Sequence, residues 1–203
     1  MPVRNQDLHG NAPDACPVAF LIVDMINDME FVDADKLFKY ALPAARKIAK
    51  LKEQAKKAGV PVIYCNDNFG RWRSDFNSQV QHCLGNDMRG KPMVELLEPD
   101  EQDYFVLKPK HSIFFATVLD VLLTYLQTKL LVITGIAGDI CILFSANDAY
   151  LRDYLINVPS DCVASNTEDQ NHYALDRMKS LLKADITPSS ELDFEELKRR
   201  ATQ

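Results

Sequence analysis

The alternation of apolar runs with amphipathic stretches is the feature that most restricts the fold of this chain. The first run, VAFLIVD at 18–24, is continuously apolar up to its final aspartate, which is typical of a strand buried on both faces. Stretches with helical periodicity alternate with this run and the later ones. Repeated strand–helix units form a parallel sheet that helices cover on both sides. The sequence therefore predicts an α/β protein with three layers, α/β/α.

The same patterns set the boundaries of the expected elements. Strands are expected at 18–24, 60–66, 104–108, 130–134, 155–161 and, briefly, near 185–187. Helices are expected at about 36–58, 115–127, 140–154, 172–184 and 189–201. We expect Pro43 to start the main part of the first helix, Gly135 to break the fourth strand, and Ser190 to cap the last helix. Residues 67–102 are expected to form a long irregular excursion, and loops of that length tend to carry function.

Composition limits the class of protein. A chain of 203 residues, 47% hydrophobic and 26% charged, is most economically one domain, expected over 17–203 after a flexible lead-in at 1–16. The net charge of −6 is spread along the chain and argues against nucleic-acid binding. No apolar stretch approaches the ~20 residues that cross a bilayer, and the lead-in lacks the apolar centre of a signal peptide. These features favour a cytoplasmic protein that does not bind membranes.

The cysteines point to reduced thiols rather than to a disulfide framework or a zinc site. There are five of them, an odd number, and no pair has CxxC or zinc-ligand spacing. Cys65, Cys83 and Cys162 are interpreted as core or incidental thiols. Cys141 differs because it opens an amphipathic stretch directly after the glycine-containing turn GIAGDI. A thiol near a helix N-terminus is favoured as a thiolate by the unpaired N–H groups and by the helix dipole.

Three chemically useful side chains stand where strands of the predicted sheet end. The first strand ends at Asp24, the third at Lys108, and the fourth leads to Cys141. Taken singly, the aspartate can cap a turn, the lysine can lie on the surface, and the cysteine can be a small buried hydrophobe. Ligand sites of parallel sheets lie outside the carboxyl ends of the strands. The convergence of an acid, a cation and a thiol at one sheet edge therefore predicts a catalytic site.

Three segments of the chain resemble the signature blocks of the isochorismatase-like cysteine hydrolases. They are AFLIVDMINDM, VLKPKHSIFFATVLDVLL and VITGIAGDICILFSANDAYLRDYLINVPSDCVAS, and the resemblance covers about 17–188. It implies a mostly parallel, six-stranded Rossmann-like sheet and an Asp–Lys–Cys triad at Asp24, Lys108 and Cys141. It also implies an oxyanion hole formed by the backbone N–H groups of Ala137 and Cys141, a cis peptide between Ile136 and Ala137, and a homodimer or homotetramer without a cofactor.

The resemblance implies a cysteine-dependent hydrolase of a C–N bond in a small amide, ureido or imide substrate. Asp24 would accept the thiol proton, Lys108 would lower the thiol pKa, and a thioester would form and then be hydrolysed. Two alternatives stay open. One is hydrolysis of an isochorismate-like vinyl ether with Asp24 as the acid and Cys141 dispensable. The other is a binding or assembly protein that retains the triad without turnover.

Two departures from the family pattern bear on the substrate. Ile26 stands where many members carry glutamine, which removes one polar contact to the substrate or to its loop. Nicotinamidases of the family bind a metal through an aspartate and two histidines after the second strand. The corresponding stretch CNDNFGRWRSDF contains Asp67 but no histidine. We therefore expect no metal.

Aromatic residues close in sequence to these blocks are candidates for the substrate pocket. Phe69, Trp72 and Phe115 are expected to line it, with a subunit interface as an equal alternative for Trp72. His111 follows Lys108 by three residues and is close enough in sequence to approach the pocket, but we expect a packed or exposed histidine.

Overall fold

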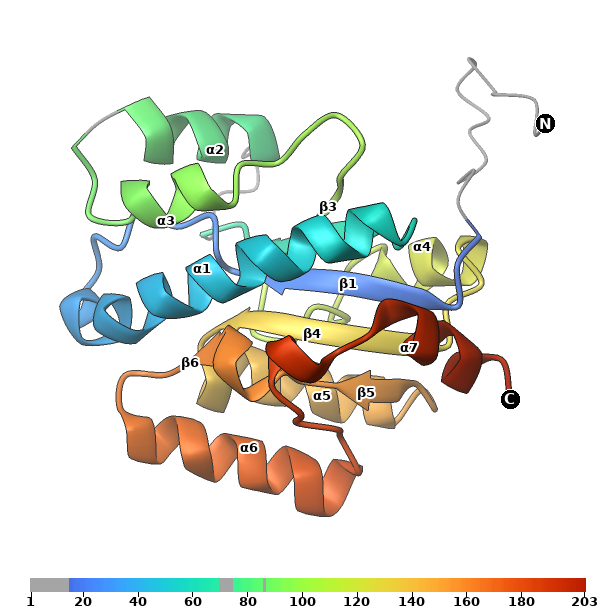
Figure 1. Cartoon of the computed structure of the whole chain (residues 1–203). Coiled ribbons are helices and arrows are strands. Elements are labelled where there is room, and N and C mark those ends of the chain that lie inside the picture. The colour runs from blue at the N-terminus through green and yellow to red at the C-terminus, as the bar shows by residue number, and fades with distance from the viewer. Residues whose placement is uncertain (1–14, 70–74, 86) are drawn as a thin grey trace.

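The structure is a computed structural model that describes residues 15–69, 75–85 and 87–203. Its centre is a parallel sheet in the order β3-β2-β1-β4-β5 (Figure 1). The short β6 pairs with the last two residues of β4, and β5 pairs with the first three. The strands are β1 (Val18–Val23), β2 (Val62–Asp67), β3 (Tyr104–Lys108), β4 (Leu130–Ile136), β5 (Leu155–Asn157) and β6 (Val163–Ala164). The predicted parallel, six-stranded α/β fold is confirmed.

Helices cover both faces of the sheet. They are α1 (Ala34–Lys57), α2 (Phe76–Gly85), α3 (Lys91–Leu96), α4 (Leu119–Tyr125), α5 (Leu143–Tyr150), α6 (Glu168–Leu182) and α7 (Phe194–Ala201). Successive residues of β1 serve opposite layers because side chains alternate along a strand. Phe20 packs into the layer of α1 and α7, and Leu21 into the layer of α4, α5 and α6. This two-sided burial explains the uninterrupted apolar run of the first strand.

The segment between β2 and β3 differs from the prediction. It was expected to be irregular over 67–102, but its described residues contain α2 and α3. Phe76, Val80 and Cys83 of α2 are buried at helical spacing, and the many polar residues around them hid this pattern in the sequence. The segment still contributes to the candidate site, because α2 forms one wall of the cavity described below.

The predicted starts of two helices, α1 and α7, were wrong. Pro43 lies inside α1 rather than at the start of its main part. Both Pro43 and Lys39, whose carbonyl loses its intrahelical donor, are exposed, so the missing bond lies on the solvent-facing side of the helix. At α7 the cap is Asp193, which accepts hydrogen bonds from the backbone N–H groups of Glu195 and Glu196 at 2.8 and 3.3 Å. Ser190 instead lies in a short 3₁₀ turn.

The last strands also differ from the prediction. The expected strand at 155–161 ends at Asn157, because a 3₁₀ turn, Ser160–Cys162, follows Pro159. The sixth strand is β6, while the region expected near 185–187 makes only one bridge, from Asp185 to Asn157. The fourth strand does not break at Gly135 but continues to Ile136, where it pairs with β6.

Smaller differences concern the helix starts and the N-terminus. Helix α4 begins at Leu119, since turns and bends occupy 109–118, and α6 begins at Glu168 after its cap Thr167. The expected lead-in at 1–16 stays a prediction, because 1–14 lie outside the described residues. Cys16 is buried and donates its backbone N–H to the carbonyl of Leu126 at 2.8 Å. Within the described part of the chain, each helix is too short or too polar to span a bilayer.

Candidate active site

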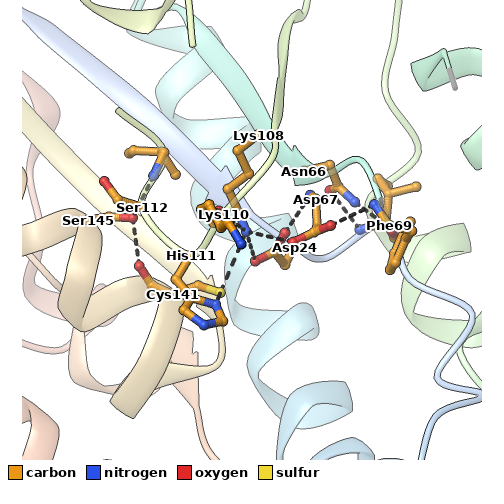
Figure 2. A network of polar contacts seen from close by, with 12 residues as sticks. Asp24, Asn66, Asp67, Phe69, Lys108, Lys110, His111, Ser112, Cys141 and Ser145 are labelled. Carbon is orange, nitrogen blue, oxygen red and sulfur yellow. Dashed lines mark hydrogen bonds and ion pairs between the residues drawn. The ribbon is translucent and has the colours of Figure 1, made fainter. Parts of the chain in front are cut away.

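The carboxyl ends of β1, β3 and β4 bring the three expected side chains together (Figure 2). Asp24 follows β1 directly with a positive φ of 56°, and its Oδ1 accepts the backbone N–H of Asp67 at 2.7 Å. Its Oδ2 lies 2.9 Å from Nζ of Lys108, the last residue of β3. The same ammonium lies 3.6 Å from Sγ of Cys141. Asp24, Lys108 and Cys141 thus form one contact group.

Glycine lets the chain deliver the thiol to this group. At Gly135 φ is +120°, and a Cβ there would lie 2.0 Å from the carbonyl oxygen of Val23. Only a residue without a side chain allows β4 to pass β1 this closely. The peptide bond between Ile136 and Ala137 is cis. A π-helical turn, Gly138–Ile142, then precedes α5 and carries the cysteine in its fourth position.

The loop after β3 is fixed to the helix that carries the thiol. Ser145 of α5 donates a hydrogen bond to the carbonyl of Cys141 at 2.6 Å and accepts one from the backbone N–H of Ile113 at 3.1 Å. Ser112 donates to the carboxylate of Asp148, also on α5. These bonds tie residues 111–114 to the helix and fix the distance between the loop and the thiol.

Burial is the largest influence on the pKa values of Asp24, Lys108 and Cys141. Lys108 is fully buried and Asp24 is 6% exposed. Burial raises the pKa of the Asp24 carboxyl above its ordinary value, although Lys108 opposes this. Burial disfavours the Lys108 ammonium, but Asp24, Cys141 and Asp67 together outweigh that effect, so the pKa of Lys108 is raised. The lysine therefore remains charged and balances one negative charge.

The thiol differs from the prediction made for it. Burial, followed by the negative charge of Asp24, raises the pKa of Cys141 to about 12, and the lysine only partly offsets this. Lys108 does lower the pKa of the thiol, as expected, but burial and Asp24 outweigh it, so the expected net lowering is not found. The sequence showed the cation but not how deeply the thiol is buried. The Asp24 carboxylate and the Cys141 thiol influence each other, because the negative charge of Asp24 disfavours a second negative charge on the sulfur.

A cavity of about 740 Å³ lies against this group. It is lined by Asp24, Asn27, Asp28, Glu30, Phe31, Leu37, Asp67, Phe69, Ser78, Gln79, His82, Cys83, His111, Ile136, Ala137, Ile140, Cys141 and Asn166. Phe69 is therefore a wall residue. Phe115 is exposed and lies outside this lining, and Trp72 falls outside the described residues.

Several lining residues were missed by sequence reasoning. Asn166 comes two residues after β6, so the strand-end rule would have found it had β6 been recognised. His82 lies on α2, inside the segment expected to be irregular. His111, expected to be packed or exposed, is exposed but also lines the cavity, and its Nδ1 lies 3.8 Å from Sγ of Cys141. Nothing in its sequence context showed that the loop after β3 turns toward the thiol.

Ile26 has a structural role in place of the polar contact expected of a glutamine. Its side chain is fully buried in the core, and its backbone is held by Asn66 through bonds of 3.3 Å from its N–H and 2.7 Å to its carbonyl. Within the described residues, His, Cys, Asp and Glu side chains form no group of three that could hold a metal. The arrangement at hand is a thiol, a carboxylate and an ammonium beside a cavity, which is suited to nucleophilic attack with internal proton transfer.

Known proteins resemble this chain in sequence and in fold. The model of the isochorismatase domain family matches residues 18–190. An uncharacterised isochorismatase family protein, YaaI of Bacillus subtilis (strain 168), is 45% identical over 174 residues, covering 86% of this chain and 95% of its own. A ureidoacrylate amidohydrolase, RutB of Methylorubrum extorquens, is 27% identical over 190 residues, which cover 79% of this chain and 74% of its own. The crystal structure of N-carbamoylsarcosine amidase from Thermoplasma acidophilum superposes with a TM-score of 0.67 at 26% identity, covering 87% of this chain and 98% of that one.

Proposed function

The chain belongs to the isochorismatase family, whose members are hydrolases, and we propose that it hydrolyses a C–N bond in a small amide, ureido or imide substrate through a thioester on Cys141. The observation that carries the proposal is the contact of the Lys108 ammonium with both the Cys141 thiol and the Asp24 carboxylate at the wall of a cavity. Two relatives support the bond type, since their names describe a ureidoacrylate amidohydrolase and an N-carbamoylsarcosine amidase.

The first step forms the nucleophile and the tetrahedral intermediate. Asp24 accepts the thiol proton as the sulfur attacks the substrate carbonyl, so the active site keeps one negative charge beside Lys108 throughout. This internal transfer explains how a thiol with a raised pKa serves at neutral pH, because the proton leaves only as the new C–S bond forms. The backbone N–H groups of Ala137 and Cys141 are the proposed donors to the oxyanion.

The second half of the cycle returns the site to its starting state. The C–N bond breaks, Asp24 gives its proton to the departing nitrogen, and a thioester remains on Cys141. The ionised Asp24 then takes a proton from water, whose oxygen attacks the thioester carbonyl. The C–S bond breaks, the acid product leaves, and the sulfur recovers the proton from Asp24. Neither a metal nor a further cofactor enters this balance.

A second candidate function is favoured by one observation. The raised pKa of the Asp24 carboxyl is suited to an acid that protonates a vinyl ether. Such cleavage needs no covalent bond to Cys141. We rank it second because it leaves the contacts between Lys108 and the thiol without a purpose.

The proposed reaction is tested by a substrate panel with the wild-type protein. Primary amides, N-carbamoyl amines and cyclic imides are assayed for amine or ammonia release, and an isochorismate-type vinyl ether for pyruvate release. We expect turnover of at least one C–N substrate and a lower kcat/KM for the vinyl ether. Exclusive vinyl-ether cleavage would support the second candidate, and no turnover of any compound would favour a binding or assembly role.

We also propose that the protein is a cytoplasmic homodimer or homotetramer. Cys65, Cys83, Cys141 and Cys162 are free thiols, which suits a reducing compartment. Val118, Val121 and Tyr125, on and next to α4, are more than half exposed and offer apolar surface for a second copy. Light scattering should give two or four times the 23.0 kDa chain mass, and a mass of one chain would contradict the proposal.

A further inference from the structure

His111 is the group at the reactive sulfur that the cycle above does not use. Its Nδ1 lies 3.8 Å from Sγ of Cys141, within the range of hydrogen bonds to sulfur. Figure 2 shows the dashed lines from the sulfur to Lys108 and to His111 running in opposite directions. Lys108 is fully buried and Asp24 is 6% exposed, whereas the imidazole is exposed, and both Asp24 and His111 line the cavity. The thiol is thus contacted by the buried Lys108 and by the exposed His111.

The imidazole is held where it lies. Its ring packs on Phe144 with centroids 5.6 Å apart, and the next residue, Ser112, is bonded to Asp148. Ser145 joins the loop to the carbonyl of Cys141, as described above. The contact between imidazole and thiol therefore spans two segments that are joined by hydrogen bonds. A positioned histidine is the usual group for proton transfer near neutral pH.

We propose that His111 is a catalytic residue that serves as a second proton acceptor for the Cys141 thiol, on the cavity side. In this step the S–H bond breaks, the proton bonds to Nδ1, and the sulfur keeps the electron pair. The thiolate formed in this way lies between two cations, the Lys108 ammonium and the His111 imidazolium, while Asp24 stays ionised. The two cations then balance two anions, the thiolate and the Asp24 carboxylate. Without a charge on His111, Lys108 alone would have to balance both anions. The proposal deepens the proposed function and rests on it for its catalytic meaning.

Other titratable groups share the cavity and define the background of a pH study. The described ones are Asp24, Asp28, Glu30, Asp67, His82, Cys83 and Cys141, with Lys108 directly behind the thiol. His82, on the wall formed by α2, contacts Asp28, with 3.1 Å between Nε2 and Oδ2. His111 is therefore the histidine whose contact with sulfur the structure records.

The test is the rate of iodoacetamide alkylation of Cys141, followed by peptide mapping from pH 5 to 10. It compares the wild type with His111→Asn and His111→Gln. Asparagine keeps a hydrogen-bonding atom near the place of Nδ1 but cannot take up a proton. Exposed His172 on α6 supplies the control His172→Gln. Because alkylation needs no substrate, the result does not depend on whether a C–N bond is the true target.

We expect the wild type and His172→Gln to be alkylated at pH 7 at least about tenfold faster than both His111 variants. The difference should shrink toward pH 10, where hydroxide begins to remove the thiol proton directly. Rates within twofold of the wild type in both variants would overturn the proposal and leave His111 as a packing partner of Phe144. Retention of the rate by His111→Asn alone would also overturn it, since hydrogen bonding rather than proton uptake would then suffice. Hydrolysis that fails while the His111-dependent alkylation persists would count against the proposed function only.

Discussion

Replacing Cys141 by alanine is expected to lower kcat for C–N hydrolysis by about 10⁴-fold or more, since the group that forms the covalent bond is removed. The substitution removes a partly buried side chain at the cavity wall, so the fold should persist. The measurement is the release of amine or ammonia from the best substrate of the panel.

A second thiol provides the matched control. Cys162 is buried in the core and does not line the cavity, so Cys162→Ala should retain hydrolysis within a few-fold. Pyruvate release from a vinyl ether discriminates between the two enzymatic functions. If Cys141→Ala cleaves its best substrate as fast as the wild type, the covalent mechanism is wrong and acid catalysis by Asp24 takes its place.

The second large effect is expected for Asp24→Asn. An amide cannot accept the thiol proton, so kcat should fall by about 10³-fold or more. The variant also leaves the buried Lys108 ammonium without its nearest carboxylate, which lies at 2.9 Å in the wild type. Loss of one partner from a buried ion pair costs about 3–5 kcal/mol of folding free energy. Both kcat and the free energy of unfolding in urea are measured.

The chain contains a second buried ion pair that separates these two effects. Asp103 lies 2.6 Å from Nζ of Lys52, has a side chain that is 1% exposed, and lies outside the lining of the cavity. Asp103→Asn should therefore cost a similar folding free energy with kcat nearly unchanged. An equal loss of activity in both variants would show that stability, not proton transfer, explains the result for Asp24.

The parts of the fold and site that could be predicted depend on short-range patterns and topology. The apolar run 18–24 predicts a buried strand without any knowledge of its neighbours. The last residues of parallel strands lie at one edge of the sheet. Asp24, Lys108 and Cys141 therefore met as the strand ends suggested. Helix α2 was missed because Phe76, Val80 and Cys83 are few among polar neighbours.

What could not be predicted depends on burial and on loop paths. The sign of the Cys141 pKa shift is set by how deeply the thiol and the Asp24–Lys108 pair lie, which no local sequence pattern records. The contact of His111 with the sulfur requires the loop 109–118 to turn over the helix, guided by bonds to Ser145 and Asp148. Sequence neighbours of Lys108 gave no sign of these long-range partners.

The claim that Cys141 is the covalent nucleophile is tested most directly by trapping the acyl-enzyme. A p-nitrophenyl ester of a small acid is mixed with the wild type, and samples are acid-quenched during turnover for intact-mass and peptide analysis. The account predicts a burst of about one p-nitrophenolate per chain and a mass increase equal to the acyl group, located on the peptide that contains Cys141 and absent in Cys141→Ala. Turnover without a burst or adduct, at a rate that Cys141→Ala matches, would contradict it.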